Sequence, residues 1–121
     1  MKLIGSLIEE EYRAELLKGH DSLFKQKGNK KRLLAVIKKT FPDMQTAYVL
    51  DWIPEQGEDI YTILVNVDSI AEIEVPMCNN NTPKVIRIIA VSDFQRYLRK
   101  HKRIKLSLGL EMASKDLGDH R

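Results

Sequence analysis

The 121-residue sequence lacks the features that mark several large classes of protein. It has a single cysteine, Cys78, which cannot form an internal disulfide, and no apolar run approaches the length of a membrane span. The first residues carry one lysine and a short apolar pair before Glu9, which is not the pattern of a secretory signal. With four prolines and six glycines, the chain has no long linker. We therefore expect a cytoplasmic protein of one domain, spanning residues 1–121, with a hydrophobic core.

Patterns typical of catalysis and of metal or cofactor binding are missing as well. His20, His101 and His120 lie far apart without partners at metal-ligand spacing, so we predict exposed histidines and no metal site. The segment 27–31 lacks the pattern of a phosphate-binding loop. Cys78 would need a base and an orienting group to act as a nucleophile. We expect no enzyme activity and no cofactor; a catalytic Cys78 stays a third possibility, which predicts unusual thiol reactivity.

Basic residues are absent from one long stretch of the chain. Residues 40–77 contain no Lys or Arg but eight acidic residues: Asp43, Asp51, Glu55, Glu58, Asp59, Asp68, Glu72 and Glu74. Residues 18–39 hold eight basic residues against one acidic, and residues 84–105 again hold eight against one. The chain has a net charge of only +3, but it is divided into acidic and basic regions. Either the acidic or the basic region could bind a partner.

The acidic stretch falls in a region that predicts β-structure. Four short apolar segments are separated by turn-forming residues and lie at 46–53, 60–67, 70–75 and 84–91. Because the connections are too short for a parallel crossover, we expect one antiparallel sheet. In the first strand Tyr48, Leu50 and Trp52 should share a face, and in the third Glu72 and Glu74 should point to solvent.

Helices are predicted on both sides of this sheet. Ser6-Leu7-Ile8-Glu9 fits a capping box that would open a first helix, and Gly19 is placed to end it. A second helix runs from about residue 30 to 40, where Phe41-Pro42 stops it.

A second capping box, Ser92-Asp93-Phe94-Gln95, should open a basic helix whose apolar face includes Phe94, Tyr97 and Leu98. Residues 104–112 alternate like a strand, yet their composition favours a helix; we predict a helix and keep a fifth strand as the alternative. The expected fold is α+β, with an antiparallel four-stranded sheet packed against N-terminal and C-terminal helices.

Two charged surfaces are candidate binding sites. The acidic face comprises Asp51, Glu55, Glu58, Asp59, Asp68, Glu72 and Glu74. Such a face protects a sheet from aggregation, or presents a phosphate-like surface to a basic partner. The alternative basic surface comprises Lys30, Lys31, Arg32, Arg96, Arg99, Lys100 and Arg103, which could grip phosphates.

Parts of the sequence resemble a known class of proteins. The stretches are Ile63-Leu64-Val65-Asn66-Val67 to Ile73-Glu74-Val75-Pro76, then Val91-Ser92-Asp93-Phe94-Gln95-Arg96-Tyr97-Leu98, and Arg103-Ile104-Lys105-Leu106-Ser107-Leu108-Gly109-Leu110-Glu111-Met112. Over about the C-terminal half, this pattern is similar to small bacterial immunity proteins of contact-dependent inhibition and other polymorphic toxin systems. The resemblance implies a cytosolic, non-enzymatic protein that binds and neutralises one cognate toxin, often a nuclease.

The sequence thus leads to two functional hypotheses. In the first, the acidic face covers the basic active or substrate-binding surface of a toxin domain. In the alternative, the protein binds nucleic acid through the basic clusters at 25–39 and 96–105. Neither hypothesis involves a membrane.

Overall fold

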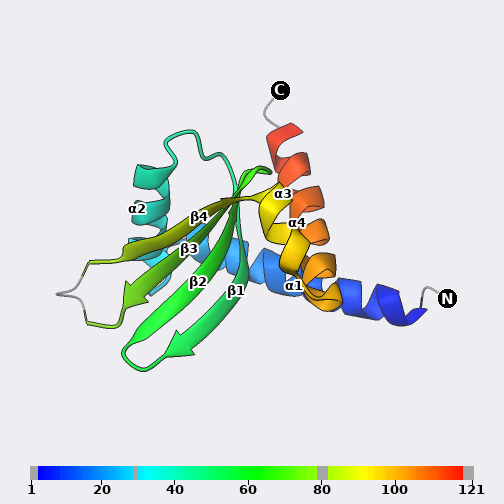
Figure 1. Cartoon of the computed structure of the whole chain (residues 1–121), viewed down its shortest axis with the longest axis horizontal. Helices are drawn as coiled ribbons and strands as arrows, with labels where there is room; N and C mark the ends of the chain where they lie inside the picture. The colour runs from blue at the N-terminus through cyan, green and yellow to red at the C-terminus, as the bar shows by residue number, and fades with distance from the viewer. Residues whose placement is uncertain (1–2, 29, 79–81, 119–121) are drawn as a thin grey trace.

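The computed structural model describes residues 3–28, 30–78 and 82–118 and has the predicted α+β fold (Figure 1). The elements in chain order are α1 (Leu3–Phe24), α2 (Lys30–Thr40), β1 (Ala47–Glu55), β2 (Glu58–Val65), β3 (Ser69–Pro76), β4 (Lys84–Ala90), α3 (Val91–Phe94), the 3-10 helix η1 (Gln95–Tyr97) and α4 (Lys100–Gly118). The strands form one antiparallel sheet in the order β1-β2-β3-β4. Helix α2 and all four strands match the predicted bounds to within two residues.

The sheet separates two hydrophobic clusters. On the side that we call the α2 face, strand residues such as Ile63 and Ile73 pack with Leu33 and Ile37 of α2. On the opposite side, the α4 face, strand residues including Tyr48, Leu64 and Ile70 pack with Leu106 and Met112 of α4. Figure 1 shows α2 and α4 at different sides of the sheet. Charged groups on these two helices therefore belong to different surfaces.

Helix α1 is longer than predicted because it packs along the edge strand β1. It begins at Leu3, before Ser6, and continues through Gly19 to Phe24, so neither predicted boundary is correct. A β-carbon on Gly19 would lie 3.3 Å from the Cβ of Val49, which shows how closely the two backbones approach. Glycine at this position provides close packing instead of a helix end.

His20 belongs to the same contact between α1 and β1. Its Nδ1 lies 2.8 Å from the carbonyl oxygen of Ala47, and its ring stacks on Tyr48 with the centroids 4.5 Å apart. The prediction of an exposed histidine is wrong here, because the side chain is half-buried. His20 thus occupies an outward-facing carbonyl of the β1 edge, which would otherwise be open to strand pairing.

Two bulges change which strand residues share a face. The register passes from Val49↔Ile63 to Asp51↔Thr62 and leaves Leu50 as an extra residue in β1. Trp52 therefore opposes Tyr61 on the α2 face, and it does not share a face with Tyr48 as predicted. In β4 a second shift makes Ile86 the extra residue between Val85 and Arg87.

The C-terminal region is helical but interrupted. The predicted basic helix consists of α3 and η1, and the chain then becomes extended at Leu98 before α4 begins. Ala90 precedes α3 without any side-chain cap bond, so the predicted capping box of Ser92 does not form. Residues 104–112 lie inside α4, which confirms the helix and rules out the fifth strand. Tyr97 next to this break has 87% of its surface exposed. The prediction that it belongs to the apolar face of a helix is therefore wrong.

Candidate functional site

A cleft of about 390 Å³ lies between the α4 face of the sheet and helices α1, α3 and α4. Its apolar lining includes Leu50, Ile53 and Phe94, and its charged lining includes Asp51, Glu72 and Lys102. The β1 bulge gives the cleft this composition, because it turns Asp51 to the same face as Thr62 and Glu72. The cleft offers an apolar floor with charges of both signs around it.

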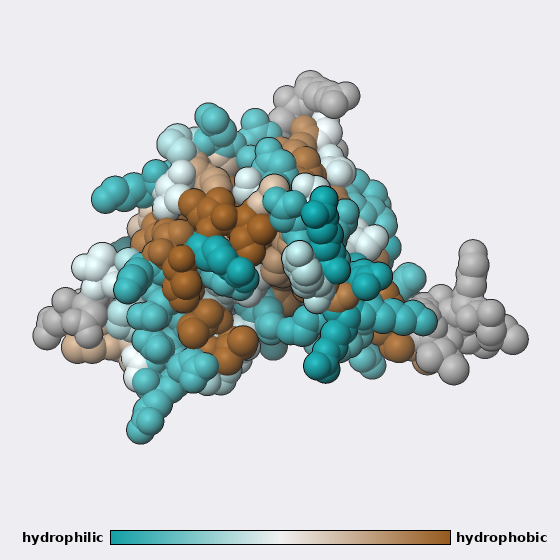
Figure 2. Space-filling view, viewed as in Figure 1, coloured by the Kyte–Doolittle hydropathy of each residue, from teal (hydrophilic) through white to brown (hydrophobic). Residues whose placement is uncertain are grey.

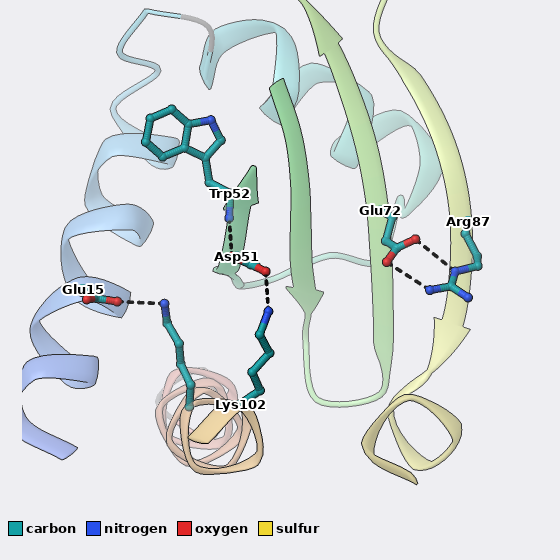
Figure 3. Close-up of polar contacts among 7 residues, drawn as sticks. Glu15, Asp51, Trp52, Glu72, Arg87 and Lys102 are labelled. Atoms are coloured by element: carbon teal, nitrogen blue, oxygen red, sulfur yellow. Dashed lines mark hydrogen bonds and ion pairs between the residues drawn. The ribbon is translucent and has the colours of Figure 1, made fainter. Parts of the chain in front are cut away.

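The charges around the cleft are paired with one another (Figure 3). Lys102 Nζ lies 2.8 Å from Asp51 Oδ2, and Arg87 donates to both oxygens of Glu72 at 3.0 and 3.1 Å. The hydrogen bonds to Glu72, and its charge, raise the pKa of Arg87 above its usual value. Lys105 Nζ likewise lies 2.8 Å from the Glu15 carboxylate of α1. The cleft is therefore close to neutral, and its ion pairs fix the positions of these side chains.

A different arrangement occurs at the β1–β2 hairpin, where Glu55, Glu58 and Glu74 form a cluster that we call the acidic tip. Glu55 opposes Glu58 across the hairpin, and Glu74 lies on the same face one strand further along. The pKa of Glu58 is raised, first by its hydrogen bond with Glu74, then by partial burial and by the charges of Glu74 and Glu55. Lys84, opposite Glu74, lowers that pKa in part. In the described part of the chain, none of the three carboxylates forms an ion pair.

The structure divides the predicted acidic face. Asp51, Glu72 and the acidic tip share the α4 face. Asp59 opposes Val75 on the α2 face and is buried, with 6% of its surface exposed. Asp68 lies in the β2–β3 turn at the other end of the sheet, where its carboxylate accepts from Ser69. Asp59 and Asp68 therefore do not contribute to the surface that was predicted for them.

Apolar side chains are exposed beside the acidic tip. Ile53 on β1 is 46% exposed and Ile86 in the β4 bulge is 47% exposed. Figure 2 shows hydrophobic side chains gathered over the sheet next to the C-terminal helices, around a hydrophilic centre. We call this uncovered part of the α4 face, together with the acidic tip, the open face. It combines apolar area with negative charge that Lys84 offsets only in part.

The predicted basic surface is also divided. Lys30, Lys31 and Arg32 lie on α2, whereas Arg96, Arg99, Lys100 and Arg103 lie around η1 and the start of α4, on the other side of the sheet. Lys30 Nζ sits 5.5 Å from the centre of the Tyr61 ring. Arg32 donates to the carbonyl oxygens of Pro76 and Cys78, and so holds the chain that follows β3. Two of the three α2 cations therefore contribute to packing.

Part of the second group lines a groove of about 410 Å³ between η1 and α4, the basic groove. Arg96, Arg103, Gln95 and Ser107 line it, with Leu106 and Leu110 as the apolar part. Arg103 also donates from Nε to the carbonyl oxygen of Leu98 at 2.8 Å. The sequence located these cations but missed the exposed Tyr97 among them, since its spacing from Phe94 is that of a buried helix face.

A polar cluster that resembles catalytic machinery is buried beneath α4. Asp116 Oδ2 accepts hydrogen bonds from Tyr48 Oη and Thr46 Oγ1, both at 2.6 Å. Burial, followed by this bond to Asp116, raises the pKa of Tyr48 well above its usual value. Tyr48 and Thr46 are almost fully buried, and the cleft and basic groove are lined by other residues. The cluster therefore anchors the end of α4 to β1.

Neither metal ligands in the described chain nor known relatives identify a function. Within the described ranges no group of three or more His, Cys, Asp or Glu could hold a metal ion, and Cys78 is an exposed free thiol. Among those same residues, no helix is long and apolar enough to span a membrane. Comparison with known proteins found no matching protein family, curated protein or solved structure.

Proposed function

We propose that this protein is a cytoplasmic, non-enzymatic immunity protein that binds a cognate bacterial toxin domain and covers its active or substrate-binding surface. A nuclease is the toxin class that fits best, because a surface that binds phosphates carries Lys and Arg. The observation that carries the proposal is the acidic tip, where Glu55, Glu58 and Glu74 gather without ion-pair partners among the described residues.

Holding these carboxylates together is unfavourable for the isolated protein. The raised pKa of Glu58 reports this cost, because its charged form is disfavoured next to Glu74. A basic partner surface would remove the repulsion on binding. The same negative field would speed the encounter with that surface and disfavour acidic competitors.

The exposed isoleucines supply the second element of an interface. Ile53 and Ile86 lie on the open face with about half of their surface in solvent. Apolar contacts at the centre of an interface provide much of the affinity, whereas charges set the rate and specificity of association. Asp51 and Glu72 already have cation partners at the cleft, so they contribute shape and orientation more than net charge.

The test measures binding to the toxin domain encoded by the neighbouring gene. Glu74→Lys in the acidic tip should raise the Kd by at least about tenfold, mainly by slowing association, and should weaken its dependence on salt. The matched control is Glu10→Lys, which makes the same charge change at an exposed position of α1. The control should alter the Kd by less than about twofold, as expected for a charge outside the interface.

A second readout is protection of cells that express the toxin domain. The wild-type protein and Glu10→Lys should restore growth, and Ile53→Asp combined with Glu74→Lys should not. The proposal would be wrong if the neighbouring gene product did not bind, or if both charge reversals weakened binding equally.

A further inference from the structure

In the described part of the chain, the cations around the basic groove have no carboxylate partner, although Arg103 donates to the Leu98 carbonyl oxygen. Lys102 and Lys105, on the same helix α4, are paired with Asp51 and Glu15 at 2.8 Å. Within the ranges that the structure describes, no carboxylate lies within ion-pair distance of Arg96, Arg99, Lys100 or Arg103. Acidic side chains are therefore within reach of α4 but pair with the cations on its cleft side.

The position of two of these cations at the start of a helix adds to the electrostatic cost of holding them close together. Lys100 and Arg103 lie in the first turn of α4, which contains no acidic residue. The amino end of a helix carries partial positive charge, so cations there are unfavourable and anions are favoured. Arg96 and Arg103 line a groove that also offers the side chains of Gln95 and Ser107 as hydrogen-bonding groups, and Arg99 and Lys100 lie between these two arginines in the sequence. This set of groups matches phosphate oxygens.

Tyr97 lies in the same segment, directly after Arg96, and is 87% exposed. An exposed aromatic ring among cations is the usual device of proteins that bind single strands, because unpaired bases stack on the ring while cations hold the backbone. A duplex hides its base faces inside the stack and would gain nothing from Tyr97. The combination therefore favours a single strand.

We propose that the basic groove is a second binding site, independent of the acidic tip, and that it takes single-stranded nucleic acid. Arg96 and Arg103 bind the phosphates in the groove, Arg99 and Lys100 extend the positive surface beside it, and Tyr97 stacks on a base. The α2 cations take no part, since they lie across the sheet and Lys30 and Arg32 make contacts of their own.

The experiment uses fluorescence anisotropy of a labelled twelve-nucleotide oligouridine titrated with the full chain between about 50 and about 200 mM salt. If four phosphates are neutralised, log K should fall with log salt with a slope of about −2.8. Arg99→Ala should weaken binding and reduce the slope by about 0.7. Tyr97→Ala should weaken binding about tenfold and leave the slope unchanged, because stacking releases no counterions.

Lys31→Ala on α2 is the matched control, since it removes one exposed cation from the other side of the sheet. It should change the affinity by less than about twofold, with a smaller change of slope than Arg99→Ala. Arg103 is left intact, because its bond to the Leu98 carbonyl supports the break between η1 and α4.

Four results would overturn the proposal. They are the absence of saturable binding at the lowest salt, an effect of Lys31→Ala as large as that of Arg99→Ala, duplex binding as tight as single-strand binding, and saturable binding of a phosphoserine peptide but not of oligouridine. All of them are separable from a failure of the toxin-binding proposal, which is tested with Glu74 and Ile53.

Discussion

The cleft and the acidic tip lie on the same face of one sheet, but their carboxylates differ in whether they have cation partners. At the cleft, Asp51 and Glu72 each have a cation within 3.0 Å. At the tip, Glu55, Glu58 and Glu74 neighbour one another, and the pKa of Glu58 is raised as a result. Repulsion among three carboxylates at a hairpin does not stabilise the fold. The difference separates the carboxylates that are paired within the fold from those that the proposed partner would compensate.

Helix α4 repeats this contrast with cations. Lys102 and Lys105 face the cleft side and are paired, whereas Arg103 lines the basic groove and, like Lys100 in the same first turn, has no carboxylate within ion-pair distance in the described chain. One helix thus carries a compensated and an uncompensated group of cations. Internal contacts, paired charges and uncompensated charges should therefore differ in their energies.

The largest effect is expected from the buried cluster that positions α4. Asp116→Ala removes the acceptor of both Tyr48 and Thr46, whose side chains are 2% and 1% exposed. Leaving two buried hydroxyl groups without an acceptor should lower the free energy of unfolding by about 3 kcal/mol. Urea unfolding followed by circular dichroism measures this loss.

Ser114→Ala is the control for that variant, because Ser114 is an exposed residue of the same helix. It should change the free energy of unfolding by less than about 0.5 kcal/mol. A loss below about 1 kcal/mol for Asp116→Ala would show that the cluster does not anchor α4 as the geometry indicates.

A double-mutant cycle compares a paired charge with an uncompensated one. Glu72 and Arg87 are joined by two hydrogen bonds but are partly exposed, so their coupling energy should be small but measurable. Glu74 and Lys84 are register partners without an ion pair, and their coupling should lie within about 0.2 kcal/mol of zero. Alanine substitutions and urea unfolding give both values. Equal couplings would contradict the description of the tip as uncompensated.

Much of the fold could be predicted from the sequence, because its signals are local. Apolar and polar residues alternate along the β-strands, and turn residues lie at the strand ends. Phe41-Pro42 predicts the end of α2, which ends at Thr40 in the structure. Three features could not be predicted, since each depends on packing between distant segments. Gly19 continues α1 because Val49 lies against it, and a bulge at Leu50 inverts the predicted face of Trp52. The break at Leu98 then separates η1 from α4 and exposes Tyr97.

The candidate surfaces were predicted in composition but not in detail. The acid-only segment and the basic clusters are visible in the sequence, and both reach the surface in part. The ion pairs around the cleft join residues that are 15 to 90 positions apart, such as Glu72 with Arg87 and Glu15 with Lys105, so no local pattern reveals them. The alternation of β2 does place Asp59 on the face opposite Glu58, which is why it leaves the predicted surface.

The smallest effect concerns the pH dependence of stability. A carboxyl group whose pKa is higher in the folded protein binds protons more readily when folded, so its contribution to stability is lost as pH rises through that pKa. Glu58 has such a raised pKa, with a reference value of 4.5, whereas Glu58→Gln keeps the hydrogen-bonding shape without a charge. The Tm of the wild type should therefore fall relative to that of Glu58→Gln as pH rises from the reference value to neutrality.

Glu10→Gln on α1 is the control and should follow the wild type across this range. A constant Tm difference between the wild type and Glu58→Gln would mean that the tip holds no electrostatic cost. If the cost is present, a basic partner that removes it must also lower the pKa of Glu58 on binding. Binding would then release a proton from Glu58, whose pKa is raised in the free protein. By linkage, the partner's affinity must increase with pH over the window in which wild-type stability falls. Opposite trends in stability and affinity would thus connect the acidic tip to recognition without any assumption about the toxin's chemistry.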